Sequence, residues 1–210
     1  MTDTRKQWTR LCAELGVIVV GVLVALALEA SWGRMQDRAR EGELLADLAE
    51  EFAENEVRLR TDLARNDSVV ARLDAWHAIV STGSSVSSDS IALLLDGSLF
   101  LSRFDPLTGV LNGVIETGEL ALVRDVALRN ELAGWPGKVE EARITALDVQ
   151  AYRSSVMPEV FDVVHSSGTP ARHETVLRSL QAFSEIAVRQ QRALLIDIAE
   201  IRALLTRHEG

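Results

Sequence analysis

The sequence contains a single cysteine, Cys12, which excludes a disulfide bond within the chain. Cys12 also precedes the apolar run near the N-terminus, so it is not a lipoprotein acylation site. Histidine is scarce too, and no histidine has a second histidine or a cysteine at the three- or four-residue spacing of a helical metal site. No metal site is therefore expected from the four histidines, which are His77, His165, His173 and His208.

The chain has fewer basic than acidic residues, 22 against 31. Residues 33–210 carry the whole net charge of −9, because acidic and basic residues balance in the segment before them. Such a surface repels nucleic-acid backbones and anionic lipid headgroups, so neither is an expected partner of the domain. A Gly-rich phosphate loop is also missing, since Gly109, Gly113 and Gly118 follow no predicted strand. The sequence therefore predicts no cofactor and no catalytic activity.

What the chain does have is one apolar stretch near its N-terminus. Ten of the fourteen residues 15–28 are Leu, Ile or Val, none is charged, and Trp8 and Trp32 flank the stretch. The helical distance between the two tryptophans is roughly 36 Å, at ~1.5 Å per residue, which places each indole at a bilayer interface. The aliphatic residues favour insertion by roughly 3 to 6 kcal/mol, and Glu14 and Glu29 oppose it little because they lie near the ends.

Two other interpretations of this stretch stay open. Arg5, Lys6 and Arg10 with Ala25-Leu26-Ala27 resemble a cleaved signal peptide, and a run of this length also occurs in buried helices of soluble proteins. We favour an uncleaved signal-anchor, because the stretch leads without a turn signal into a charged helical segment. Gly21-x-x-x-Ala25 permits close approach of a second helix. The predicted anchor residues are Trp8, Glu14, Gly21, Ala25, Glu29 and Trp32.

The positive-inside rule does not decide the orientation, because three basic residues lie close to each end of the span. A short basic tail that emerges first usually stays in the cytoplasm. We therefore expect residues 1–33 to form a cytoplasmic tail and transmembrane anchor in a bacterial inner membrane. Residues 34–210 are then expected to form a helical domain on the periplasmic or extracellular side.

Beyond Arg34, apolar residues recur every three or four positions among Ala, Leu, Glu and Arg, which predicts an all-α fold. One helix is expected to run from the membrane to about Ser81. Asn55 and Asn66 are expected where its apolar stripe turns toward water, and control of helix pairing by a buried amide is the alternative. The stripe comprises Leu45, Leu48, Phe52, Leu59, Leu63, Val70, Leu73, Trp76 and Val80. A solvated helix face is expected for the acidic run Glu50, Glu51, Glu54 and Glu56.

The segments that follow carry turn and capping signals. The Ser-rich residues 81–90 predict a flexible connection, followed by a short helix over residues 91–95. Asp105-Pro106 predicts the start of a helix that runs to Thr117, and Gly118 is expected to end it in the left-handed conformation. Asp125 is expected to cap another helix, which ends before a break or kink at residues 134–137.

Two further helices complete the domain. One is expected over residues 138–164, kinked at Pro158, and the last begins at Thr169-Pro170. The last helix carries a coiled-coil-like seam, interrupted by Gln191, that suits packing along the first helix. Together these elements predict a transmembrane helix that continues into an elongated antiparallel helical bundle. The seam comprises Leu177, Leu180, Ala187, Leu194, Ile198, Ile201 and Leu205.

Residues 105–135, with ETGELALVRD at their centre (residues 116–125) and Leu128-Arg129 after it, resemble the central signature of a family of uncharacterised bacterial single-pass membrane proteins. Residues 14–32 are similar to that family's anchor, in which an acidic residue opens an apolar run that ends in Trp. The sequence departs from the family at Glu29-Ala30-Ser31, where amide or aspartate residues are more usual. The resemblance implies one anchor and a helical domain, and it implies no activity and no catalytic residue.

The segment after Gly118 is the strongest candidate for a site in the domain. Its apolar residues are expected to tuck into the bundle, and the alternative is that the bend lines a small cleft for a ligand or partner. The cleft residues would be Glu116, Gly118, Arg124, Asp125 and Arg129.

Three classes of function follow from these observations. The first is a membrane-anchored interaction or scaffold module that forms a homo-oligomer or binds another membrane protein. The second is a ligand-binding sensory domain that signals through a partner membrane protein, since the tail before the span is too short for an output domain. The third is an enzyme, for which the sequence offers no grouping of acid, base and nucleophile.

Overall fold

The computed structural model describes residues 3–82, 101–165 and 170–207, with side chains omitted for residues 3–17, 80 and 161–173. The chain divides into two compact units, Met1–Ala46 and Asp47–Gly210. The all-α prediction is confirmed, because the described residues form helices and contain no strand. The predicted Ser-rich connection beyond Thr82 and the short helix over residues 91–95 lie outside the described residues.

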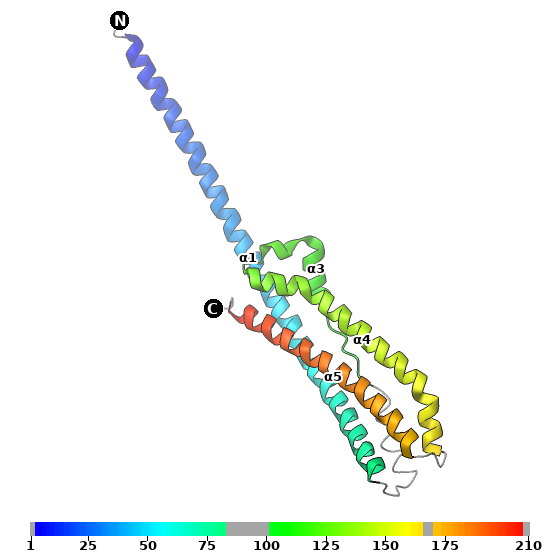
Figure 1. Ribbon diagram of the computed structural model, residues 1–210. Coiled ribbons are helices and arrows are strands. Elements are labelled where there is room, and N and C mark those ends of the chain that lie inside the picture. The colour runs from blue at the N-terminus through cyan, green and yellow to red at the C-terminus, as the bar shows by residue number, and fades with distance from the viewer. Residues whose placement is uncertain (1–2, 83–100, 166–169, 208–210) are drawn as a thin grey trace. The chain divides into compact units, whose positions relative to one another are not determined.

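Helix α1 spans Asp3–Ser81, as its continuous periodicity predicts, and α5 spans Pro170–Thr206 with proline at its first position. Three contacts between them fix their relative direction. Glu56 pairs with Arg202, Asn66 hydrogen-bonds Gln191 at 2.9 Å, and Asp74 accepts a hydrogen bond from Gln181. Residue numbers rise along α1 as they fall along α5, so α5 and the second part of α1 are antiparallel (Figure 1).

Helix α4 spans Val126–His165 and also runs antiparallel to α5 (Figure 1). The two helices are linked by the Lys138–Asp197 ion pair at 2.8 Å and by the stacked rings of Tyr152 and Phe183, whose centroids are 3.9 Å apart. Of the break or kink predicted at residues 134–137, the break is wrong, since α4 continues through Pro136 and also contains Pro158. Trp135 is 1% exposed, and its burial against the bundle favours helix over a break at this point.

The bundle core combines the apolar stripes of these three helices. Phe52 of α1 meets Trp135 of α4 edge to face, with ring centroids 5.4 Å apart. Near the other end, Leu73 and Trp76 pack with Val160 of α4 and Leu177 of α5. In the α1 stripe, Val69 is buried in place of the predicted Val70, because the stripe drifts around the helix by one position. The predicted α5 seam is buried at Leu177, Leu180, Leu194, Ile198, Ile201 and Leu205.

Residues 101–108 form a return segment that contains no helix, and helix α3 follows over Gly109–Thr117. The predicted start at Asp105-Pro106 is therefore wrong. The physical reason is that Leu107 uses both its backbone N–H and its C=O in hydrogen bonds to Asn55, so these groups are withheld from a helical turn. Gly118 ends α3 with a φ of +76°, which confirms the left-handed cap predicted there.

The first unit differs from the bundle in the exposure of its aliphatic side chains. Ile18 is 62% exposed, Leu23 is 59% exposed and Leu28 is 65% exposed. Among the described residues, α1 is the helix long and apolar enough to cross a membrane, judged by length and composition. The predicted domain boundary was 33/34, whereas the division into compact units falls between Ala46 and Asp47.

Candidate functional site

The return segment is held against the bundle by two buried asparagines. Asn66 accepts a hydrogen bond from the Ser102 N–H at 2.7 Å and donates to the Ser102 C=O at 2.8 Å. Asn55 makes the same pair of bonds with Leu107, at 2.7 and 2.8 Å. Each amide thus satisfies a donor and an acceptor of one backbone residue, as a neighbouring strand would. The expectation that these amides turn toward water is wrong, since both are 0% exposed.

Further polar contacts extend this arrangement across the bundle. Gln191 of α5 donates to the Ser102 C=O at 3.0 Å and accepts from Asn66 at 2.9 Å. The Ser102 hydroxyl donates to Asp62 at 2.5 Å. We name Asn66, Ser102 and Gln191 the amide cluster. It connects α1, the return segment and α5, and burial makes each of its hydrogen bonds costly to lose.

Glu51, one helical turn before Asn55 on α1, binds the start of α3, which follows the return segment. Its carboxylate accepts hydrogen bonds from the backbone N–H groups of Val110 and Leu111, at 2.7 and 3.2 Å. These are N–H groups of the first turn of α3, which lack partners within that helix, and a carboxylate there also interacts favourably with the helix dipole. The prediction of a solvated face is wrong for Glu51, which is 7% exposed.

A cavity of about 160 Å³ lies beside the amide cluster, between the return segment, α4 and α5. Much of its wall is apolar, and a second, more open groove lies between α4 and α5 near Lys138 and Asp197. Apolar parts of the cavity wall come from Leu101, Phe104, Ala146, Val149, Met157 and Ala187. Polar groups come from Ser102, Arg103, Thr145, Gln150, Arg153, Ser154, Gln190 and Gln191. Sequence reasoning missed this cavity.

Arg153 is a charged group of this cavity wall that is buried in the bundle. It is 3% exposed, and its guanidinium donates a hydrogen bond to the Ser184 hydroxyl at 2.8 Å. Ser184 in turn donates to the Leu180 C=O at 2.6 Å, which fixes the position of its oxygen. Burial lowers the pKa of Arg153 to about 10, so the group stays protonated at neutral pH. The bundle therefore holds a desolvated positive charge at the wall of the cavity.

Lys138 shows the contrasting case of a cation at the bundle surface. Its ammonium group lies 2.8 Å from Asp197 and 2.9 Å from Glu131. The hydrogen bond to Asp197 is the main cause that raises the pKa of Lys138 above its ordinary value. This ion pair links α4 to α5 beside the open groove, and its partial exposure keeps its contribution to stability small.

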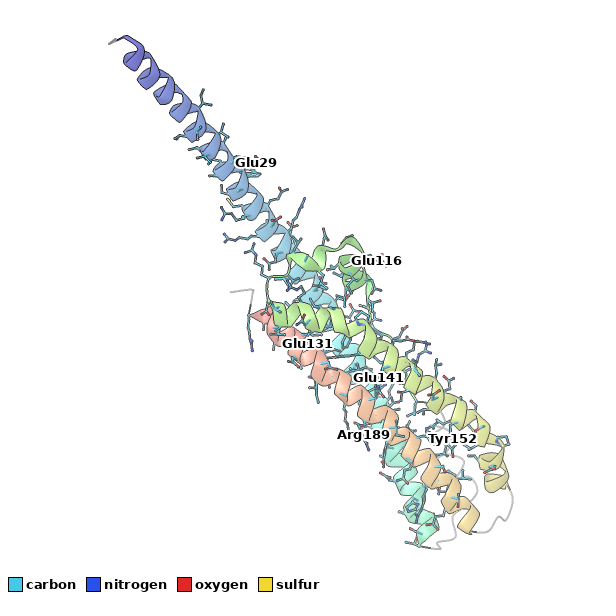
Figure 2. All side chains as sticks on the ribbon, turned by 45° about the horizontal axis from the view of Figure 1, so that its top comes forward. Glu29, Glu116, Glu131, Glu141, Tyr152 and Arg189 are labelled. Atoms are coloured by element: carbon cyan, nitrogen blue, oxygen red, sulfur yellow. The ribbon has the colours of Figure 1, made fainter. Side chains whose placement is uncertain are left out.

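The predicted cleft residues around Gly118 do not line either cavity. Asp125 instead caps α4, accepting from the N–H groups of Ala127 and Leu128 at 2.8 and 3.1 Å, as predicted. Arg129 donates to the Val123 C=O at 3.1 Å, which closes the short 3₁₀ helix η1, Glu119–Leu122. Glu116 and Arg124 are exposed. Figure 2 shows Glu116 on α3, away from the part of the bundle in which Glu141, Tyr152 and Arg189 lie.

The predicted anchor residues are placed in α1. The side chains of Trp8 and Glu14 lie outside the described residues, while Glu29 is exposed and Trp32 is 72% exposed. A methyl group added at Gly21 would meet nothing within 4 Å, so this position lies on open helix surface, as does Ala25.

The histidines do not gather into a cluster in the part of the chain that the structure describes, where no group of three or more His, Cys, Asp and Glu could hold a metal ion. His77 is partly buried beside the end of α1, and its Nδ1 has no hydrogen-bond partner. His208 and the side chains of His165 and His173 lie outside the described residues.

No family model, curated protein or solved structure matches this chain.

Proposed function

We propose that this chain is a single-pass membrane protein, in which the apolar part of α1 lies in the bilayer and residues 47–210 act as a non-enzymatic interaction or scaffold module. The observation that carries the proposal is the exposure of the apolar stretch. Leu23, Val24 and Leu26 are each more than half exposed, although removal of aliphatic side chains from water is energetically favourable. A lipid bilayer would remove this apolar surface from water, and a helix can lie in it because its backbone N–H and C=O groups hydrogen-bond to each other.

The second unit supports the role of an interaction module because it has a core of its own. Leu48, Leu132 and Ile198 are 0% exposed and come from the three long helices of the bundle. The described wall of the main cavity supplies apolar surface and hydrogen-bond donors, and it contains no carboxylate, imidazole or thiol. Such a wall suits binding better than proton transfer or nucleophilic attack.

The proposal includes an orientation, with the N-terminus in the cytoplasm of a bacterial cell and the bundle outside the inner membrane. Its interaction partner is a second copy of the chain or another membrane protein. The chain has two lysines, Lys6 before the apolar stretch and Lys138 in α4, so an amine-reactive reagent distinguishes the two sides.

The test is crosslinking of intact spheroplasts with a membrane-impermeant amine-reactive crosslinker, followed by mass spectrometry. We expect adducts of discrete size that are linked through Lys138, whose side chain is 35% exposed, while Lys6 reacts only after lysis. The mass of the adduct partner then distinguishes a homo-oligomer from a complex with a different protein.

Lys138→Arg is the matched variant, because it keeps the positive charge beside Glu131 and Asp197 and removes the reactive amine. It should abolish the adducts. Reaction of Lys6 in intact spheroplasts would contradict the orientation, and a chain that stays monomeric at every crosslinker concentration would contradict the interaction role.

The cavity favours a second candidate function, that of a ligand-binding sensory domain. Its wall combines apolar side chains with buried and rim polar groups, which is the composition of small-molecule sites. In this role, the signal would pass to a partner membrane protein, and the amide cluster would connect the ligand site to α1 through Asn66.

A further inference from the structure

The open groove between α4 and α5 carries exposed apolar side chains. Ile186 of α5 is 43% exposed, and Ala193, two turns further along the same face, is exposed too. On α4, Ile144 is 49% exposed one turn after the groove residue Glu141. Apolar residues within a polar rim are typical of a surface that another protein covers. The described residues that line the groove are Lys138, Glu141, Ile186, Arg189, Gln190, Ala193, Leu194 and Asp197.

The charge of this groove differs from that of the domain around it. Residues 33–210 carry a net charge of −9, so two copies of the domain repel each other on average. The described lining of the groove holds two basic and two acidic side chains, and its formal charge is therefore zero. A second copy can approach this face without the repulsion that it meets on the acidic surface elsewhere.

Two of the four charged groups are paired with each other, and two are not. Lys138 and Asp197 form the ion pair that links α4 to α5. The carboxylate of Glu141 and the guanidinium of Arg189 form no ion pair within the part of the chain that the structure describes. Both side chains are exposed, and they reach the groove from α4 and from α5 respectively (Figure 2). Each is thus available to a group of opposite charge on a partner.

We propose that the open groove is the interface between two copies of this chain, in a two-fold arrangement that pairs Glu141 of each copy with Arg189 of the other. The inference rests on the proposed interaction role and names its surface and its partner. In a two-fold interface every contact occurs twice, so one pair of opposite charges supplies two ion pairs. The same contact removes Ile186 and Ala193 of both copies from water, while the charges fix the register.

The test reverses the two charges one at a time. The full chain is purified in detergent micelles, and its dimer is measured by native mass spectrometry over a range of protein concentrations. Glu141→Arg places two cations opposite each other at both contacts, and Arg189→Glu places two anions there. Each variant should raise the dimer dissociation constant at least tenfold, which corresponds to about 1.4 kcal/mol.

Mixing the two variants is the sharpest part of the test. In a dimer with one chain of each kind, both contacts again join opposite charges, because each variant supplies the charge that the other has lost. The two variants differ in mass, so the spectrum identifies this mixed dimer directly. We expect mixed dimers whose dissociation constant is close to that of the unmodified chain, although neither variant dimerises well alone.

The matched controls change the net charge equally at residues that do not line the groove. Glu140→Arg lies on α4 and Arg178→Glu lies on α5, and both residues are exposed. Both controls should dimerise like the unmodified chain. Circular dichroism should report a folded bundle for all four variants, because each replaces an exposed side chain.

The inference is overturned if the unmodified chain is monomeric in micelles, if the reversals at Glu141 and Arg189 leave the dimer unchanged, or if the mixed variants stay apart. A dimer that survives both reversals would place the contact elsewhere and leave the interaction role standing. Adducts that join Lys138 to a different protein in spheroplasts would likewise support the interaction role and contradict a second copy as the partner. Failure of the groove is therefore distinguishable from failure of the interaction role.

Discussion

Replacement of Asn66 by alanine is expected to lower the free energy of unfolding of the bundle by about 3 to 5 kcal/mol. Asn66 is 0% exposed and makes three hydrogen bonds, two to the backbone of Ser102 and one to Gln191. Its removal takes the hydrogen-bond partner from the partly buried Ser102 N–H and from the side-chain oxygen of the buried Gln191, and each such group costs about 1 to 3 kcal/mol. Urea denaturation of the full chain in micelles, followed by far-UV circular dichroism, measures the loss.

The matched control is Asn130→Ala, because Asn130 is exposed on α4. It should change stability by no more than about 0.5 kcal/mol. Hydrogen exchange adds a local measurement, since the amide of Ser102 should lose its protection in Asn66→Ala and keep it in the control. Equal stability of the two variants would mean that the amide cluster does not hold the return segment in place.

Replacement of Trp135 by alanine is expected to destabilise the bundle by about 3 to 5 kcal/mol, the usual cost of removing a buried tryptophan. Trp135 is 1% exposed and packs edge to face on Phe52, so the variant loses apolar burial and an aromatic pair. Trp135 also precedes Pro136 inside α4, and loss of the buried indole should weaken the helix at that position.

Trp32→Ala is the control, since Trp32 is 72% exposed and belongs to the first unit. The same urea titration should show a change of no more than about 0.5 kcal/mol for this variant. A similar loss from both tryptophans would contradict the assignment of Trp135 to the core and of Trp32 to the anchor.

The parts of the fold that follow from local pattern were predictable. The stripe of α1 and the seam of α5 follow from the helical period, and the caps at Gly118 and Asp125 depend on the conformation of one or two residues. The end of α1 at Ser81 coincides with the start of the Ser-rich segment. Each of these features needs little information from distant parts of the chain.

The parts that depend on distant partners were not predictable in the same way. Asp105-Pro106 carries a good helix-start signal, but Asn55 binds the backbone of Leu107 and keeps the segment out of a helix. Glu51 was predicted on a solvated helix face, and the partners that bury it lie far along the chain in α3. A signal was nevertheless present, since Asn55 and Asn66 occupy the three- and four-residue spacing of the α1 core positions. A polar residue at such a position indicates a buried partner.

The cavity and the burial of Arg153 were also not predictable from local sequence pattern. Its wall brings together residues around Ser102, Arg153 and Ala187, which no sequence spacing relates. The predicted cleft residues near Gly118 were chosen from a local bend, and the structure uses Asp125 and Arg129 there to cap and close short elements. Whether a bend lines a cavity depends on how the helices pack, which local pattern does not determine.

The central claim is that the apolar part of α1 resides in lipid and tethers the bundle. Alkaline carbonate extraction of membranes tests it most directly, with two variants of α1 as an internal comparison. Leu23→Arg places a charge in the apolar stretch, at a cost of about 2.5 to 3.5 kcal/mol at the centre of a span, and Val57→Arg places it at an equally exposed position of the bundle. The unmodified chain and Val57→Arg should stay in the membrane pellet, while Leu23→Arg should be partly released. Release of the unmodified chain into the carbonate supernatant would contradict the account.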